Sequence, residues 1–174
     1  MSNGLPPIGA EIPCSAIAIN TPMKVNGVPV SVDFSGGRKY RVDVNPGDES
    51  SVRMRIVGHK MHEGGPREQN PDFAFEQNDV DVDSPSILRL TQKFPPRYEF
   101  REVTSFTMTI DRPEDDEPIV LVTKEPMVLI GQLTQFPPRG DLFQLEKPVE
   151  LINEDDPTKV VAVIEKFPVK IGGL

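Results

Sequence analysis

Apolar and polar residues alternate along most of this chain, and this period of two constrains the fold more than any other feature of the sequence. A strand places successive side chains on opposite faces, so alternation gives a strand one apolar and one polar face. The clearest apolar faces belong to four segments: Val28, Val30, Val32 and Phe34; Tyr40, Val42 and Val44; Val52, Met54 and Ile56; Phe106, Met108 and Ile110. We therefore predict a nearly pure β-protein.

Residues 97–112 are the nearest exception, because Phe100, Val103 and Phe106 are spaced for one face of a helix. The second half of this segment alternates and is rich in threonine, which favours a strand. For the whole chain we predict an all-β fold, an antiparallel β-sandwich of about 10 to 12 strands. A closed small β-barrel is the alternative.

Turn residues divide the first third of the chain into a meander. Asn26-Gly27 is a strong hairpin signal, Ser35-Gly36-Gly37 is interpreted as the next turn, and Asn45-Pro46-Gly47-Asp48 as the third. Residues 59–72 are polar and broken by glycine and proline, which predicts a long surface loop.

We expect a single β domain over residues 1–174. Matching spacings of proline, methionine and glycine suggest two related β-meanders, at about residues 12–60 and 120–174, joined by a middle segment. An unrepeated domain is the other interpretation. The matching positions are Pro22, Met23, Gly27 and Gly36 against Pro126, Met127, Gly131 and Gly140.

The chain is acidic, with a formal net charge of −8 and a pI near 4.8, which argues against binding to nucleic acid or to an anionic membrane. Its one cysteine, Cys14, excludes an intramolecular disulfide and is expected to be a small buried hydrophobe. The amino terminus lacks the pattern of a signal peptide, and no apolar run approaches the roughly 18 residues that span a bilayer. A cytoplasmic or virion-borne protein is the expectation.

One candidate metal site contains both histidines of the chain, His59 and His62, together with Glu63. Two imidazoles and a carboxylate are ligands that zinc accepts. The order is H-x-x-H-E, however, and the zinc-protease order is H-E-x-x-H on a helix. The alternative is a solvated loop whose histidines make local contacts.

A second candidate site contains Asp79, Asp81 and Asp83, which share one face if the segment is a strand and then suit calcium. The positions that an EF-hand reserves for glycine and glutamate hold Ser84 and Leu90 instead. An acidic outer face that discourages pairing between sheet edges explains the same residues without an ion. We predict no cofactor, and calcium or zinc is the alternative.

The sequence contains no nucleotide-binding or catalytic motif, so no catalytic residue is predicted. The preferred hypothesis is a non-enzymatic, structural β-sandwich that binds a protein partner or self-associates through its surface or edge strands. The alternative is a small β-barrel that binds an apolar small molecule, as a cyclase or isomerase would, with Met54 and Met108 lining its pocket. An internal cavity would favour the second, and a flat exposed apolar patch the first.

Overall fold

The computed structural model describes residues 4–63, 72–77, 86–111 and 117–173, and every regular element in them is a β-strand. The all-β prediction is confirmed. All strand pairs are antiparallel, and they form one continuous sheet. The strands are β1 (Glu11–Val25), β2 (Val28–Val44), β3 (Ser51–Glu63), β4 (Asp72–Gln77), β5 (Ile87–Lys93), β6 (Pro96–Thr104), β7 (Phe106–Asp111), β8 (Ile119–Thr123), β9 (Met127–Leu133), β10 (Arg139–Leu145), β11 (Val149–Asn153), β12 (Asp156–Ile164) and β13 (Val169–Gly173).

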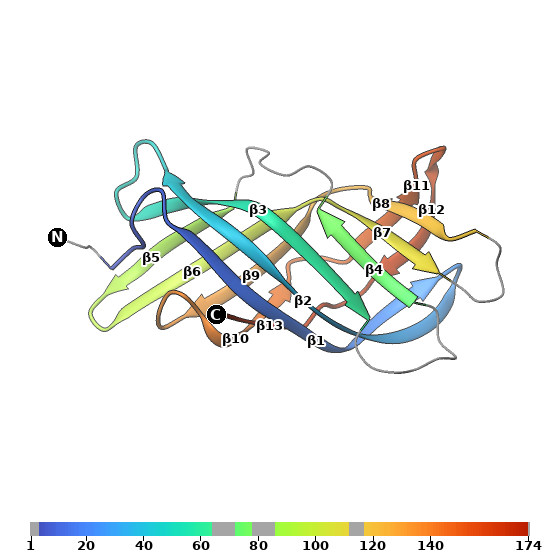
Figure 1. Ribbon diagram of the computed structural model, residues 1–174, viewed down its shortest axis with the longest axis horizontal. Coiled ribbons are helices and arrows are strands. Elements are labelled where there is room, and N and C mark those ends of the chain that lie inside the picture. Colours follow the sequence, from blue (N-terminus) through green and yellow to red (C-terminus); the bar gives the residue numbers. More distant parts are fainter. Residues whose placement is uncertain (1–3, 64–71, 78–85, 112–116, 174) are drawn as a thin grey trace.

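The sheet closes on itself twice, because β12 also pairs with β1 and β5 also pairs with β3. Ring 1 contains eight strands, β1, β2, β3, β4, β7, β8, β11 and β12. Ring 2 contains β1, β2 and β3 again, with β5, β6, β9, β10 and β13. In Figure 1 ring 1 lies on the right and ring 2 on the left, and the three shared strands run from one ring into the other.

The middle of β2 passes very close to both of its neighbours. A Cβ on Gly36 would lie 2.1 Å from the backbone oxygen of Lys60, and a Cβ on Gly37 would lie 2.7 Å from that of Cys14. Only glycine fits such an approach. The prediction of a turn at Ser35-Gly36-Gly37 was therefore wrong, because these glycines allow close packing inside one long strand.

The predicted loop at residues 59–72 also needs correction, because β3 continues through its first part to Glu63. His59 and Met61 are buried and alternate with exposed residues, one position out of phase with Met54 and Ile56, because the pairing of β2 with β3 shifts its register between Ile56 and Gly58. Residues 64–71 lie outside the described residues. The other two turns lie where they were predicted, with Gly27 and Gly47 at positive φ of 79° and 84°.

Phenylalanine side chains fill much of both rings. In ring 1, the ring of Phe34 lies against Phe73, Phe75 and Phe167, with centroid distances of 5.2 to 6.5 Å. In ring 2, Phe100 lies 5.1 Å from Tyr40 and 5.7 Å from Phe143. Each such pair adds to the stability gained by burying the rings. Met54 and Met108 are fully buried in the same core.

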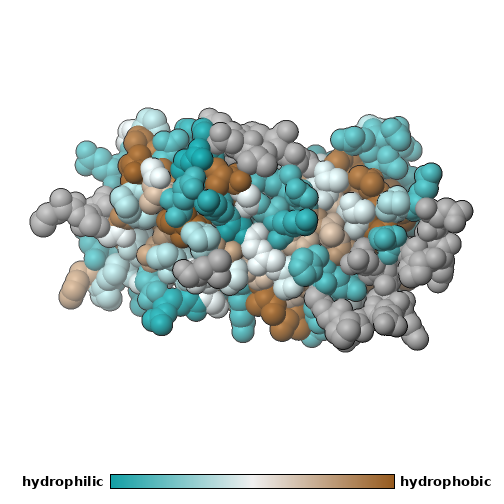
Figure 2. All heavy atoms as spheres, in the orientation of Figure 1, coloured by the Kyte–Doolittle hydropathy of each residue, from teal (hydrophilic) through white to brown (hydrophobic). Residues whose placement is uncertain are grey.

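Figure 2 shows one face of the molecule, with polar residues over most of it and apolar residues in separate patches. The exposed large apolar side chains belong to different parts of the fold: Ile8, Ile17, Ile19, Val28, Val44, Phe94, Val120 and Leu142. Across the described residues, no helix has the length and apolar character needed to cross a membrane.

Candidate functional site

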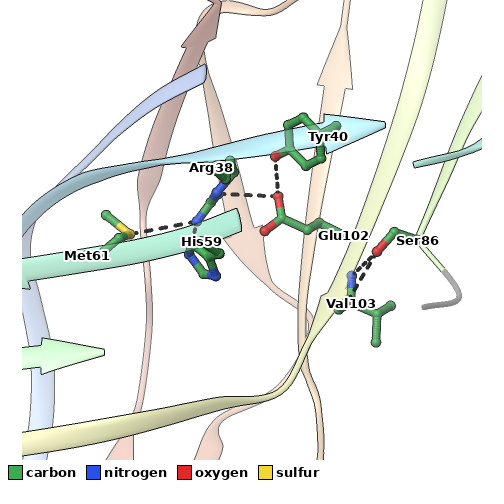
Figure 3. A network of polar contacts seen from close by, with 7 residues as sticks. All are labelled: Arg38, Tyr40, His59, Met61, Ser86, Glu102 and Val103. Carbon is green, nitrogen blue, oxygen red and sulfur yellow. Dashed lines mark hydrogen bonds and ion pairs between the residues drawn. The ribbon is translucent and has the colours of Figure 1, made fainter. Parts of the chain in front are cut away.

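A cluster of polar side chains is buried where the two rings meet. It consists of Arg38 and Tyr40 on β2, His59 on β3 and Glu102 on β6, with Met61 beside it (Figure 3). Arg38 follows the double glycine at the centre of β2, so its side chain enters the core at the junction. We call these four residues the Arg38 cluster.

Two donors converge on one oxygen of Glu102. The Nη1 atom of Arg38 lies 3.3 Å from its Oε2 atom, and the hydroxyl of Tyr40 donates to the same Oε2 at 2.6 Å. On its other side the guanidinium donates from Nη2 to His59 Nε2 at 2.6 Å and lies 3.7 Å from the sulfur of Met61. The side chains of Arg38 and Glu102 are fully buried.

Burial and charge fix the protonation of the cluster. Burial opposes the charged guanidinium, but Glu102, Tyr40 and Cys14 together outweigh burial, so the pKa of Arg38 is raised. Burial, followed by the charge of Arg38, holds the pKa of His59 well below its usual value, so this imidazole is neutral. Because His59 Nε2 accepts from Arg38, the ring proton lies on Nδ1. Burial and then the charge of Glu102 raise the pKa of Tyr40, which stays a phenol.

Three polar atoms of the cluster have no hydrogen-bond partner among the described residues: the donors Arg38 Nε and His59 Nδ1 and the acceptor Glu102 Oε1. A buried polar atom without a partner costs on the order of 1–3 kcal/mol. Most buried polar groups in native proteins are paired, so three such atoms on neighbouring residues make this cluster the candidate functional site.

Aromatic rings border the Arg38 cluster on both sides. The ring of His59 stands edge-on to Phe75 in ring 1 at 5.5 Å, and the ring of Tyr40 lies 5.1 Å from Phe100 in ring 2. Buried Cys14 belongs to the same core, and burial raises the pKa of its thiol to about 11. The surroundings are therefore apolar, and polar contacts within them are stronger than in water.

The chain folds a surface groove over one end of ring 2. Its volume is about 1020 Å³, and Leu5 and Val52, which line it, also belong to the hydrophobic core. The segment before β1 is held there by a bond from Gly9 N to the backbone oxygen of Val42 at 2.8 Å and by the hydroxyl of Tyr98, which donates to the carbonyl of Gly4.

The structure does not bring the predicted zinc ligands together. His59 points into the core, His62 is exposed on the opposite face of β3, and Glu63 is half-buried at the end of the strand. Asp79, Asp81 and Asp83 lie outside the described residues. In the part of the chain that the structure describes, no group of three His, Cys, Asp or Glu side chains has the geometry to hold a metal ion.

Sequence reasoning reached one member of the cluster, His59, and assigned it to a different site. Tyr40 was identified only as a core-facing residue, and Arg38 and Glu102 were not identified, although alternation carried a signal for them. Arg38 is two residues before Tyr40, and Glu102 is two residues after Phe100. Residues two apart on a strand share a face, so both charged side chains lie on the apolar faces of their strands. A charged residue at such a position is a buried charge, which is rare unless it is paired.

No known family model matches this chain, and no curated protein matches it. Among solved structures the fold is similar to that of DynF, from the dynemicin biosynthesis pathway of Micromonospora chersina, with a TM-score of 0.71 and 19% sequence identity. The likeness covers 98% of this chain and 83% of DynF. Because a biosynthetic protein has this fold, the preferred hypothesis of a non-enzymatic, self-assembling structural module was wrong.

Proposed function

We propose that this protein binds a small, largely apolar molecule in its interior and that the Arg38 cluster holds the polar group of that molecule. The observation that carries the proposal is the set of three unpartnered polar atoms on Arg38, His59 and Glu102, enclosed by aromatic side chains. A few placed polar groups in an apolar setting are typical of small-molecule sites. The similar fold of a protein from a biosynthesis pathway agrees with this proposal.

The groove at the end of ring 2 is the proposed entrance. Strand β2 runs from Val44, at the groove, to Arg38, and six residues of strand span about 20 Å. An elongated molecule that lies along β2 would thus reach from the groove to the cluster. To enter, it must displace Leu5, which belongs to the short segment at the end of the ring.

A second candidate function is isomerisation or cyclisation of the bound molecule. The observation that favours it is that the cluster offers a proton donor, His59 Nδ1, and a proton acceptor, Glu102 Oε1, in one buried site. A donor and an acceptor placed on one substrate can move a proton between two of its atoms. Exchange of carbon-bound hydrogen for deuterium in a bound ketone would support this second function. Binding of the ketone without exchange would contradict it and support binding as the function.

The binding proposal can be tested with N-phenyl-1-naphthylamine, a neutral apolar dye whose fluorescence rises on transfer from water. The chain has no tryptophan, so the dye is read against a low background. We expect saturable one-to-one binding that weakens when Ala16→Leu fills ring 2, whereas the matched exposed change Val120→Ser leaves it unchanged. Circular dichroism checks that both variants fold. Absence of saturable binding, or loss of binding through Val120→Ser alone, would contradict the proposal.

A further inference from the structure

We infer that the ligand of the Arg38 cluster is a neutral molecule that carries a carbonyl-type acceptor and a hydroxyl-type donor, and that the cluster discriminates against carboxylates. This inference rests on the proposed binding function and names the chemical class of its ligand. Three observations carry it: the charge balance of the cluster, the use that is already made of the guanidinium, and the kind of atoms left without partners.

The charges of the cluster already cancel. Among the described residues, three ionisable side chains of the Arg, His and Glu types are buried: Arg38, His59 and Glu102. His59 is neutral, and Arg38 and Glu102 form an ion pair at 3.3 Å. A ligand carboxylate would place a second anion beside Glu102 with one cation between them. Because the surroundings are apolar, that repulsion is weakly screened. A neutral polar group meets no such repulsion.

The guanidinium of Arg38 is also unable to grip a carboxylate in the usual way. Arginine recognises carboxylates best through two parallel hydrogen bonds from its fork. Here Nη1 faces Glu102 and Nη2 donates to His59, so both ends of the fork are occupied by side chains of the protein itself. Nε is the guanidinium nitrogen that has no partner among the described residues, and its single N–H suits one oxygen acceptor.

The unpartnered atoms define the complementary ligand. Arg38 Nε and His59 Nδ1 each present a hydrogen, which an oxygen acceptor such as a carbonyl can satisfy. Glu102 Oε1 presents an acceptor, which a hydroxyl can satisfy. In Figure 3 this second oxygen of Glu102 points away from Tyr40, so the tyrosine does not compete for it. A hydroxy-ketone satisfies both kinds of atom, and a carboxylate satisfies only the donors.

Three naphthalene probes of nearly equal size test the inference by fluorescence titration at pH 7. They are 6-acetyl-2-naphthol, which has the carbonyl and the hydroxyl; 2-acetylnaphthalene, which has the carbonyl only; and 6-hydroxy-2-naphthoate, which has a carboxylate. We expect 6-acetyl-2-naphthol to bind at least about tenfold more tightly than 6-hydroxy-2-naphthoate, as one charge-charge contact requires. 6-Acetyl-2-naphthol should also bind more tightly than 2-acetylnaphthalene, because its hydroxyl can donate to Glu102 and 2-acetylnaphthalene has no hydroxyl.

Two variants connect this preference to the cluster. Glu102→Gln removes the anion, so the cluster becomes cationic, and 6-hydroxy-2-naphthoate should gain at least about tenfold in affinity. Glu99→Gln makes the same change three residues earlier on β6, where the side chain is half-buried and accepts from Gln132, and it should leave the preference unchanged. The comparison of probes on the unchanged protein does not depend on whether Glu102→Gln folds.

The outcomes separate the two levels of the argument. If none of the probes binds, the proposed function fails and the inference fails with it. If 6-hydroxy-2-naphthoate binds as tightly as 6-acetyl-2-naphthol or more tightly, the function stands and the neutral-ligand inference is overturned. If Glu102→Gln folds and leaves the preference unchanged, discrimination does not come from this cluster and the inference is likewise overturned.

Discussion

Replacing Arg38 by methionine should destabilise the protein more than almost any other single change. The substitution keeps an unbranched side chain but removes the cation that faces Glu102 at 3.3 Å in a fully buried setting. It also removes the donor to His59 Nε2. Breaking a buried pair by removing one partner costs about 3–5 kcal/mol, because the remaining charge stays buried. In a chain of 174 residues that corresponds to a fall in Tm of roughly 6 to 20 °C.

The double variant Arg38→Met with Glu102→Leu separates the charge effect from a packing effect. With both charges gone, the remaining defects are the hydroxyl of Tyr40, which loses its acceptor Glu102, and His59 Nε2, which loses its donor in Arg38→Met as well. A buried unpaired hydroxyl costs on the order of 1–3 kcal/mol. The double variant should therefore be more stable than Arg38→Met alone, although it carries one more substitution.

Urea unfolding followed by far-ultraviolet circular dichroism measures these free energies. Arg101→Met is the matched surface control, because Arg101 pairs with Glu146 on the exposed side of β6 and its loss should hardly move the midpoint. The reasoning is refuted if Arg38→Met costs less than about 1 kcal/mol, the upper range for an exposed pair. It is also refuted if the double variant loses the sum of the two single losses.

Three further predictions concern packing and titration. Gly131→Ala should cost about 1–3 kcal/mol in urea unfolding, because its Cβ would lie 2.7 Å from the ring of Phe143, whereas Gly58→Ala, with no atom nearer than 4.0 Å, should be nearly neutral. Burial raises the pKa of the Cys14 thiol to about 11, so the free energy of unfolding should fall as the pH rises above about 8.5, where the thiol of the unfolded chain ionises. Cys14→Ala should reduce that fall, and an equal fall in both proteins would contradict the prediction. The pKa of His59 is held well below its usual value, so below about pH 6.5 this histidine gains a proton in the unfolded state alone. The free energy of unfolding should therefore drop between neutral pH and pH 5.5. If His59→Asn shows the same slope of unfolding free energy against pH, the drop does not come from His59.

Local chemistry made much of the fold predictable. Asn26-Gly27 and the turn that contains Pro46 and Gly47 lie where their backbone preferences place them. Alternation identified most core-facing residues of β2 and β3, but Val28 and Val44, at the two ends of β2, are exposed. The role of Gly36 and Gly37 was misjudged because the same dipeptide suits a turn and a close strand crossing. Which one occurs depends on β1 and β3, whose backbones approach from distant parts of the sequence.

The candidate site was less accessible to sequence reasoning, for a physical reason. Arg38 and Glu102 are 64 residues apart and meet only when β2 and β6 join the same ring. Alternation along a strand predicts that each of them lies on an apolar face, but it does not predict that Arg38 contacts Glu102. His59 was assigned to a zinc site because His62 is close to it along the chain, yet an odd separation on a strand puts the two rings on opposite faces.

The three strands common to both rings make the halves of the molecule inseparable. Any truncation that removes ring 1 also shortens the walls of ring 2, and leaves unpaired backbone groups on every cut edge. Neither half can therefore be excised as a stable fragment, and both should melt in a single cooperative transition. A ligand that stabilises one ring would for the same reason raise the melting temperature of the other ring.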